Sequence, residues 1–417
     1  MSRFLYNLSV RSYQALVHLA APFHRKAAKW VAGREGLLEK MAREMAGQQG
    51  PVVWFHCASL GEFEQGRPLM EALRAEYLRH TLVLTFFSPS GYEIRKNYGG
   101  AHHVFYLPPD SADNARRFLD LVQPELAVFV KYEFWYHYLK ELRQRHIPAI
   151  SVSAIFRPEQ LFFKPYGGFY RGMLRLLTHL FTQNQASADL LRQAGIDQVS
   201  VAGDTRFDRV LQSAAQAKAI PLAAAFQGTD QVMVIGSSWP QDMEVLLPFI
   251  RHHHPDLRFI IAPHEIHEAD IRALSQKLEG LAVRFSQASE GTVSDYRVLL
   301  IDNIGLLSSL YAYATYAYIG GAFGKGLHNT LEAAVFGVPL FFGPAYLKFQ
   351  EAVDLVALHC AFPVQSLPEL ETKFRLISTS TDELPRIRQQ AKEYIAGQAG
   401  ATDTIMEACR QWLSFKL

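Results

Sequence analysis

The chain has 417 residues, enough for two domains of ordinary size, and its 49% hydrophobic and 20% charged residues are typical of a folded globular protein. A formal net charge of +2 excludes the strong basic excess of most nucleic-acid-binding proteins, so we expect no nucleic-acid partner. The three cysteines, Cys57, Cys360 and Cys409, lie far apart and match no metal-ligand spacing. They indicate a reducing compartment rather than a disulfide scaffold.

Residues 1–36 form a basic and apolar segment ahead of the first predicted strand. Six Arg and Lys residues precede the first acid, Glu35, and apolar residues recur between them at roughly helical spacing. The apolar run is interrupted and is too short for a membrane span, which needs about 20 residues. The segment favours an amphipathic helix that lies on a membrane surface containing anionic lipid. A helix packed on the protein's own core is the alternative.

From residue 37 to residue 208 the sequence predicts an N-terminal Rossmann-like domain. Short β-branched or aromatic runs alternate there with helical segments, and this alternation is typical of a parallel sheet covered by helices on both faces. The predicted strands are residues 52–57, 81–87, 103–107, 126–131, 149–154 and 179–183.

A second Rossmann-like domain is predicted over residues 229–382, after a linker at 209–228 that is rich in Ala, Gln and Ser. Residues 383–417 continue as one long helical pattern. The predicted strands of the second domain are residues 232–236, 258–262, 298–301, 317–319 and 340–342. Two such domains predict a deep cleft between them, with ligands at the C-terminal ends of the strands.

The strongest local motif is GGAFGKGLHNTLEAA, from Gly320 to Ala334, between a predicted strand and a predicted helix. Glycines let the backbone approach a phosphate, and the free N–H groups of a helix start favour its negative charge. Lys325 and His328 can add donors, and Glu332 can accept from ribose hydroxyls. A glycine-rich turn that binds nothing is the alternative.

Carboxylates follow two strands of the first predicted domain. Glu62 ends the segment Ala58–Glu62 (ASLGE), where it can take a proton from an attacking hydroxyl, or else only complement the start of its helix. Glu133 begins EFW after another strand, at the same edge of the sheet. In the second domain the turn at 236–239 (GSSW) suits a carboxylate or phosphate, and 262–265 (APHE) ends the next strand.

Together these segments resemble the Kdo (3-deoxy-D-manno-octulosonic acid) transferases of Gram-negative bacteria, glycosyltransferase family 30. The resemblance covers nearly the whole chain and is carried most by ASLGE at 58–62, EFW at 133–135 and GG…HNTLEAA at 320–334. Further strings fall in the family's order, namely FSPSGYE at 87–93, QN at 183–184, GDTRFD at 203–208 and FGP at 342–344.

This resemblance implies the GT-B fold and an inverting, metal-independent enzyme without cofactor, which moves Kdo from CMP-Kdo to a lipid A precursor in lipopolysaccharide biosynthesis. It implies a place at the cytoplasmic face of the bacterial inner membrane. Glu62 is then the catalytic base, and Glu133, Ser59 and Gly61 bind the acceptor. The residues expected to bind the donor are Ser237, Ser238, Pro263, His264, Gly321, Lys325, His328, Asn329 and Glu332.

Three positions depart from the family's pattern and bear on donor and acceptor contacts. Trp239 stands where a His is common, His264 where an Arg is common, and Lys131 where an acid is common.

Two other functions compete with transfer. A nucleotide-sugar epimerase also has two Rossmann-like halves, but its soluble substrates leave the basic N-terminal segment without a role. In a non-catalytic nucleotide- or lipid-binding protein, the carboxylates at the strand ends would have no role.

Overall fold

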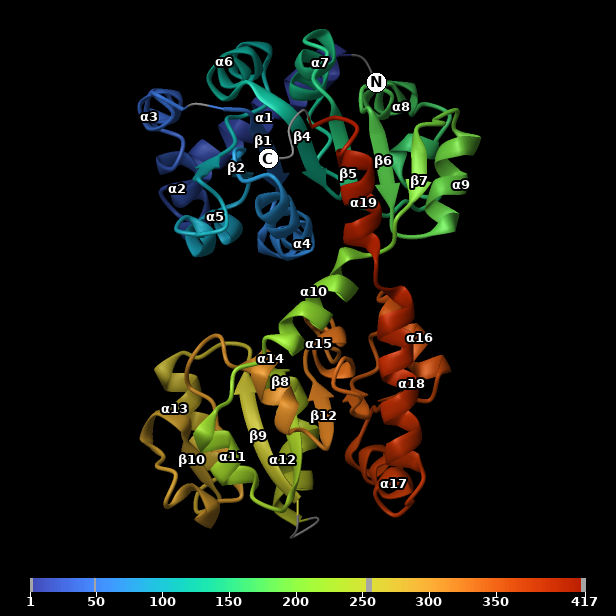
Figure 1. The fold of residues 1–417 in the computed structure, drawn as a ribbon. Helices are drawn as coiled ribbons and strands as arrows, with labels where there is room; N and C mark the ends of the chain where they lie inside the picture. The colour runs from blue at the N-terminus through green and yellow to red at the C-terminus, as the bar shows by residue number, and fades with distance from the viewer. Residues whose placement is uncertain (1–2, 49, 253–256, 414–417) are drawn as a thin grey trace. The chain divides into compact units, whose positions relative to one another are not determined.

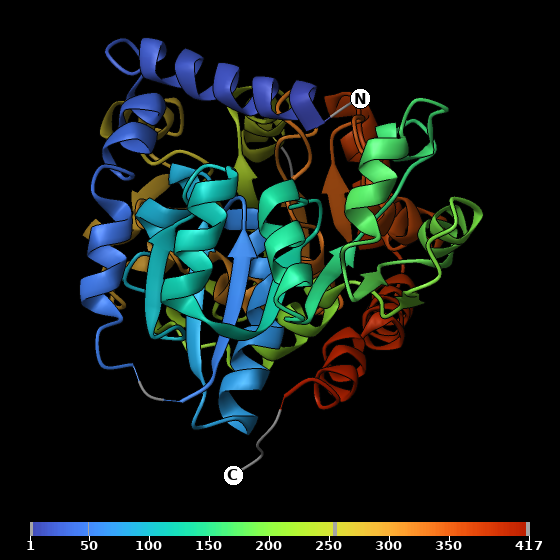
Figure 2. The same cartoon turned by 90° about the horizontal axis from the view of Figure 1, so that it is seen from above.

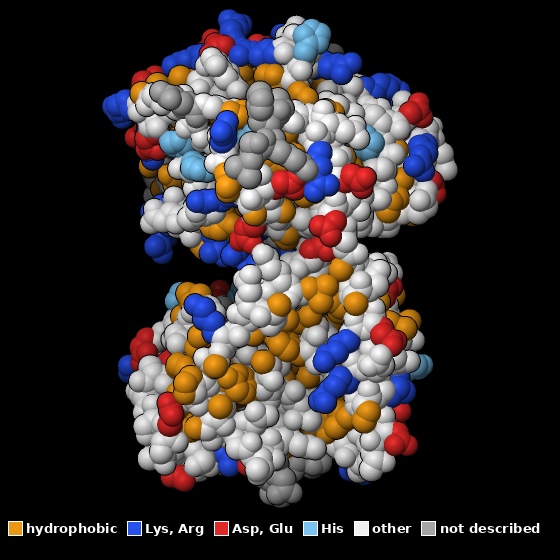
Figure 3. All heavy atoms as spheres, viewed as in Figure 1, with side chains coloured by type: hydrophobic (Ala, Val, Ile, Leu, Met, Phe, Trp, Pro, Cys, Tyr) orange, Lys and Arg blue, Asp and Glu red, His pale blue; other side chains and the backbone are white. Residues whose placement is uncertain are grey.

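The computed structural model describes residues 3–48, 50–252 and 257–413. The chain divides into two compact units (Figure 1). Unit 1 comprises residues 1–209 and 398–417, and unit 2 comprises residues 210–397. On the face drawn in Figure 3, acidic and basic side chains both occur on each unit, as the small net charge leads one to expect.

The described part of unit 1 contains a seven-stranded parallel sheet in the order β3-β2-β1-β4-β5-β6-β7. Its strands are β1 Val52–Cys57, β2 Thr81–Phe86, β3 His103–Tyr106, β4 Pro124–Val130, β5 Ala149–Ala154, β6 His179–Thr182 and β7 Val199–Val201. Its helices are α1 Arg3–Ala20, α2 Arg25–Ala32, α3 Leu37–Glu44, α4 Leu60–Glu76, α5 Pro89–Arg95, α6 Ala112–Val122, α7 Tyr136–Gln144, η1 Leu161–Phe163, α8 Gly168–Leu174, α9 Gln185–Gln193 and α19 Ala401–Cys409.

Strand β1 lies in the middle of this sheet and shows why the fold has three layers. All six of its residues are buried, as expected for a parallel strand covered on both faces. Because successive side chains point to opposite faces, Trp54 packs with apolar residues of α6 and α7, whereas Val53 and Phe55 pack with those of α4 and α19.

The described part of unit 2 repeats this design in a sheet of order β10-β11-β9-β8-β12-β13-β14. Its strands are β8 Gln231–Ser238, β9 Leu257–Pro263, β10 Ala282–Arg284, β11 Val298–Leu300, β12 Tyr316–Ile319, β13 Leu340–Phe342 and β14 Ala361–Pro363. Its helices are α11 Pro221–Gln227, α12 Pro240–His252, α13 Glu268–Lys277, η2 Phe285–Gln287, η3 Val293–Asp295, α14 Leu307–Leu310, η4 Tyr311–Tyr313, α15 Leu331–Ala334, α16 Gln350–Ala357, α17 Leu367–Ser378 and α18 Glu383–Gln398.

The predicted fold class is confirmed, since each unit is a parallel α/β sandwich of the Rossmann type. Every strand predicted from the sequence is present, with ends within two residues of those expected. The pattern missed β7, β10 and β14, each of three residues. These strands are mostly not buried and show no apolar run, whereas the equally short β11 and β13 are fully buried and were predicted.

Two segments differ from their prediction. The expected linker at 209–228 is largely helical, because α10 (Thr205–Ala215) and α11 occupy most of it. Its Ala and Gln residues favour a helix even without a strong apolar stripe. The expected long helix at 383–417 is two helices, α18 and α19. Gly400 separates them with φ of 106°, a backbone conformation that glycine adopts most easily.

Helix α1 is the helix expected in the N-terminal segment, and it runs along unit 1 (Figure 2). On its inner side the buried Tyr6 donates a hydrogen bond of 2.5 Å to Asp110. The apolar residues on its outer side share one stripe at 100° per residue and are exposed, namely Phe4, Leu5, Leu8, Leu16 and Leu19. No helix within the described residues is long and apolar enough to cross a membrane.

Asp208 joins α19 to unit 1, and its loss is expected to destabilise the protein. Its carboxylate accepts from Gly400 N–H at 2.6 Å, Thr402 N–H at 2.7 Å and Thr402 Oγ1 at 2.6 Å. We expect Asp208→Ala to lower the free energy of unfolding by about 1–3 kcal/mol, because part-buried donors lose their acceptor. Denaturant unfolding of this variant and of Asp403→Ala, an exposed acid on α19, tests this. Equal effects of the two variants would contradict it.

Candidate functional site

The residues expected from the sequence gather at one place in each sheet. In unit 1 the chain moves outward from β1 to β3 and then returns to β4 on the other side of β1. In unit 2, β8 and β12 are neighbours for the same reason. Ligands of doubly wound sheets bind at such topological switch points, beyond the C-terminal ends of the strands. Glu62 follows β1, Glu133 follows β4, Ser238 ends β8 and Gly320 follows β12.

Glu62 is held by the backbone that precedes its helix. Its Oε2 accepts from Ala58 N–H at 2.5 Å and from Ser59 N–H at 3.1 Å. Ser59 is the N-cap residue of α4, and Glu62 stands at the third helical position, the arrangement of a capping box. Glu62 therefore does stabilise its helix start, and the two bonds leave Oε1 for the proton of a hydroxyl.

The environment of Glu62 suits a base that works near neutral pH. Burial and then the negative charge of Glu133 raise the pKa of Glu62 to about 7, although the Ala58 N–H group, the Lys131 charge and the Ser59 N–H group oppose them. A general base is most effective when its pKa lies near the working pH. Lys131, a departure from the family's pattern, therefore supplies a positive charge beside the carboxylate pair.

Glu133 is fixed by two ring nitrogens. Its Oε2 lies 3.2 Å from His56 Nε2 and accepts from Trp135 Nε1 at 2.9 Å. His56 is fully buried, and its Nδ1 lies 2.9 Å from Thr85 Oγ1. His56 was not among the residues expected from the sequence. The signal that was available is a histidine inside the otherwise apolar strand VVWFHC, directly before ASLGE.

Glu133 also faces an aromatic cavity of about 430 Å³ in unit 1. The cavity lies between α1 and the loops after β2, β3 and β4, and its lining includes Tyr13, Trp30, Phe87 and Trp135. The rings of Phe87 and Trp135 lie 4.8 Å apart. Apolar walls with two carboxylates, those of Asp110 and Glu133, suit an amphipathic ligand. Ser59 and Gly61 are not among the lining residues and lie instead at the start of α4.

Asp242 organises the corresponding place in unit 2. It is fully buried on α12, and its Oδ2 accepts from Trp239 N–H at 2.8 Å and from Gly321 N–H at 2.9 Å. Its Oδ1 accepts from the Tyr318 hydroxyl at 3.1 Å, and burial raises the pKa of the carboxyl. Gly321, which was expected to bind the sugar donor, therefore already uses its N–H group in a hydrogen bond within the protein. Asp242 was not among the residues expected from the sequence, because it looks like an ordinary acid in a helix start.

Three rings stack beside this carboxylate. His264 stacks on Trp239 at 4.5 Å and on His328 at 4.4 Å, and Trp239 Nε1 donates to His328 Nε2 at 3.0 Å. Burial and then His264 lower the pKa of His328 to about 4, so this ring is neutral at pH 7. Its proton must then be on Nδ1. Trp239 and His264, both departures from the family's pattern, thus contact each other.

The glycine-rich loop packs tightly against the end of β8. A Cβ on Gly320 would meet Ser237 O at 2.2 Å, so only glycine fits there. Helix α15 after the loop has only four residues, which makes its dipole weaker than the sequence suggested. Asn329 closes the loop, because its Oδ1 accepts from Leu331 N–H at 3.2 Å and its Nδ2 donates to Glu332 at 3.1 Å.

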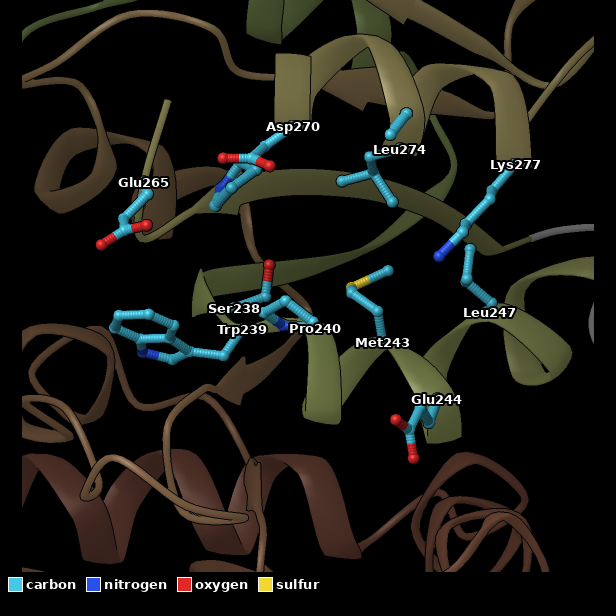
Figure 4. A pocket seen from close by; sticks show the side chains of 12 residues that line it. Ser238, Trp239, Pro240, Met243, Glu244, Leu247, Glu265, Asp270, Leu274 and Lys277 are labelled. Carbon is cyan, nitrogen blue, oxygen red and sulfur yellow. The ribbon is translucent and has the colours of Figure 1, made fainter. Parts of the chain in front are cut away.

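A second cavity, of about 310 Å³, adjoins Trp239 in unit 2 (Figure 4). Met243 from α12 and Leu274 from α13 project toward each other across it. Ser238 lines it, and Pro263 does so from the end of β9. Within the described residues, Ser238 Oγ and Thr330 Oγ1 are buried without a hydrogen-bond partner. Such atoms usually have partners, so they are available to a ligand.

The structure thus brings the nine expected donor residues together in unit 2, at the ends of the adjacent strands β9, β8 and β12 and in the loop after β12. It brings the expected base and acceptor residues together in unit 1, after β1 and β4. Two parallel α/β units, one with carboxylates and one with a glycine-rich loop at its switch point, form the GT-B fold expected from the sequence.

Comparison with known proteins agrees with the resemblance stated from the sequence. Residues 33–209 match the family model described as 3-deoxy-D-manno-octulosonic-acid transferase (kdotransferase). The 3-deoxy-D-manno-octulosonic acid transferase of Bordetella pertussis is 28% identical over 99% of this chain and 100% of its own length. That of Chlamydophila psittaci is 29% identical over 71% of this chain and 70% of its own length. These matches confirm the resemblance to the Kdo transferases.

Solved structures agree with the fold. The UDP-GlcNAc 2-epimerase of Neisseria meningitidis, bound to UDP-GlcNAc, superposes with a TM-score of 0.61 and covers 87% of this chain and 100% of its own. It is 16% identical, so the likeness is one of fold alone. The epimerase alternative therefore gains no support from it.

Replacing Asp242 should destabilise unit 2. In Asp242→Ala the buried N–H groups of Trp239 and Gly321 lose their acceptor, so we expect a loss of about 2–4 kcal/mol of unfolding free energy. Denaturant unfolding followed by tryptophan fluorescence measures it. Glu244→Ala, at an exposed acid two residues further along α12, serves as the control and should stay within about 0.5 kcal/mol of the unmodified protein. An equally stable Asp242→Ala protein would remove Asp242 from its scaffolding role.

Proposed function

We propose that this protein transfers Kdo from CMP-Kdo to a hydroxyl of a lipid A precursor, with inversion at the anomeric carbon. The observation that carries the proposal is Glu62, a carboxylate with a raised pKa at the switch point of unit 1, in a chain that resembles the Kdo transferases. The acceptor oxygen bonds to the anomeric carbon, and the bond from that carbon to the CMP phosphate breaks.

Glu62 accounts for the proton of this reaction. As the acceptor hydroxyl attacks, its proton passes to Glu62 Oε1, while the bonding pair leaves with the CMP phosphate. The two N–H groups on Oε2 hold the carboxylate in place, so its free oxygen is oriented before the substrate arrives. A pKa of about 7 keeps a large fraction of the base ionised at neutral pH.

On the donor side, the residues of unit 2 supply hydrogen-bond donors and one positive charge. We assign the turn at Ser237 and Ser238 to the Kdo carboxylate or the donor phosphate, since Ser238 Oγ has no partner among the described residues. We assign Asn329 and the backbone after it to the CMP phosphate and Glu332 to the ribose. Donors aimed at the leaving phosphate stabilise its charge as the bond breaks. Lys325, with its Nζ 5.5 Å from the Trp239 ring, adds to this field.

On the acceptor side, the aromatic cavity of unit 1 fits a lipid-linked sugar. Rings such as Trp30, Phe87 and Trp135 offer flat apolar faces to a sugar or the start of an acyl chain, and Glu133 offers an acceptor for its hydroxyl groups. Helix α1 forms one wall of the cavity with Tyr6, Val10 and Tyr13 on its inner side.

The outer side of α1 supports membrane association at the cytoplasmic face of the inner membrane. Its exposed apolar stripe ends near Phe23, which is 91% exposed. Beside it, Arg25, Lys26 and Lys29 of α2 line an open groove with Ser90 of α5. Apolar side chains next to basic ones suit an interface that contains anionic lipid.

Glu62→Gln tests the chemical assignment. The glutamine oxygen still accepts the two backbone N–H groups but cannot take a proton, so we expect kcat to fall about 10²- to 10⁴-fold while CMP binding is kept. Transfer of Kdo from CMP-Kdo to a lipid A precursor, followed by mass spectrometry, measures it. Glu71→Gln, on the same helix and paired with Arg67, is the matched control. Rates within a few-fold of the unmodified enzyme for Glu62→Gln would exclude this base.

The membrane assignment is tested by replacing Leu8, Leu16 and Leu19 together with Ser. We expect co-sedimentation with vesicles containing anionic lipid to weaken at least about 10-fold, because each exposed leucine loses apolar burial in the interface. Binding of the unmodified protein should also weaken as salt rises. The control replaces Ile304 and Leu376 of unit 2, which are equally exposed, with Ser. Unchanged binding of the α1 variant would place the membrane contact elsewhere.

A further inference from the structure

His56 is a fully buried histidine with a polar partner on each ring nitrogen. It is the fifth residue of β1, and its ring lies in the apolar interior of the sheet. Its Nε2 is 3.2 Å from Glu133 Oε2, and its Nδ1 is 2.9 Å from Thr85 Oγ1. A ring held at both nitrogens has one orientation, so whatever it contacts is held as well.

The partners determine which nitrogen donates to Glu133. An ionised carboxylate oxygen only accepts hydrogen bonds, so the Nε2 that faces it must carry a proton. Trp135 Nε1 lies 2.9 Å from the same oxygen and 3.1 Å from His56 Nε2; because its proton goes to the nearer carboxylate oxygen, two N–H groups converge on Oε2. Thr85 can donate to or accept from Nδ1, because its hydroxyl has one proton and also receives Trp54 Nε1 at 2.8 Å. Donation from Thr85 to Nδ1 gives the neutral Nε2–H tautomer, in which Nε2 donates to Glu133 and Trp135 directs its proton to the same carboxylate.

We propose that His56 is a positioning residue for the transfer reaction: through Nε2–H it fixes the ionised Glu133 carboxylate beside Glu62. This inference rests on the proposed function, because it takes Glu62 as the base. The charge of Glu133 increases the proton affinity of Glu62, so His56 acts on the base through Glu133 and need not contact either substrate.

The surrounding groups leave Glu133 as the main negative charge acting on the base. Burial and then Glu133 raise the pKa of Glu62, and Lys131 opposes them. Burial, followed by the charges of Glu62 and Glu133, raises the pKa of Cys57 well above its usual value, which keeps that thiol neutral. The titratable and charged groups around the pair are His56 and Cys57 of β1, Glu62 and Glu64 of α4, and Lys131 and Tyr132 after β4.

Two substitutions separate positioning from packing. His56→Gln keeps an N–H donor near the place of Nε2, whereas His56→Leu fills similar space without one. In His56→Leu the Glu133 carboxylate loses this donor and its fixed orientation, so its negative charge is no longer held beside Glu62. We expect kcat to fall about 10- to 100-fold and the acid limb of the kcat/KM profile to move down by roughly 1 pH unit. His56→Gln should keep the limb in place and recover most of the rate.

These pH profiles decide between the two roles. If His56→Leu lowers kcat without moving the acid limb, or if His56→Gln behaves like His56→Leu, then His56 only packs the strand and the proposal is overturned. Thermal unfolding and CMP binding of both variants show whether the fold is kept.

A measurement without turnover keeps the test independent of the activity. In ¹⁵N-histidine-labelled full-length protein, the His56 Nε2 resonance is expected to show a bound proton, and Glu133→Gln is expected to shift it. An Nε2 without a proton would overturn the proposal even in an active enzyme and even if both variants fail to fold. Full activity of Glu62→Gln would instead refute the proposed base and leave the His56–Glu133 hydrogen bond standing.

Discussion

Keeping two carboxylates side by side in a partly buried place is the constraint on which the rest of unit 1 depends. Glu62 and Glu133 are 71 residues apart in the chain. They lie close together because β1 and β4 are neighbouring strands: the chain builds the sheet outward from β1 to β3 and then returns to the other side of β1. Like charges disfavour each other, so each carboxylate needs its own fixed donors: backbone N–H groups for Glu62 and ring N–H groups for Glu133. The buried strands around them hold those donors rigid.

Unit 2 uses a buried carboxylate for a different purpose. Asp242 gathers two loop N–H groups and a tyrosine hydroxyl, and it thereby holds the turn after β8 against the glycine-rich loop after β12. A charge or polar group that is buried with its full set of hydrogen bonds specifies one loop arrangement. The residues proposed to bind the ligand, such as Ser238 and Lys325, can then vary without the scaffold changing. Trp239 and His264 illustrate this, since both depart from the family's pattern and yet stack on each other.

The sequence predicted most of the fold because its long strands are continuous apolar runs such as VVWFHC and TLVLTF, which read as buried parallel strands. Glu62 and Glu133 were found because each directly follows such a run. His56 and Asp242 were not, since their partners lie 77 residues away at Glu133 and 79 residues away at Gly321. No local pattern encodes a contact of that range. The same limit explains α19, whose place in unit 1 depends on Asp208, almost two hundred residues earlier.

The return of the chain to unit 1 has a consequence for synthesis of the protein. Ile405 and Met406 of α19 complete the apolar layer that also contains Leu69 and Leu73 of α4. While the ribosome is still translating residues 210–397, that layer lacks its last helix, although all strands of unit 1 have already emerged. Unit 2 is continuous in the chain and can fold as a self-contained insert. Unit 1 is instead complete only after the final segment has been synthesised. Until then part of its apolar surface is uncovered, and co-translational chaperones would recognise such a surface.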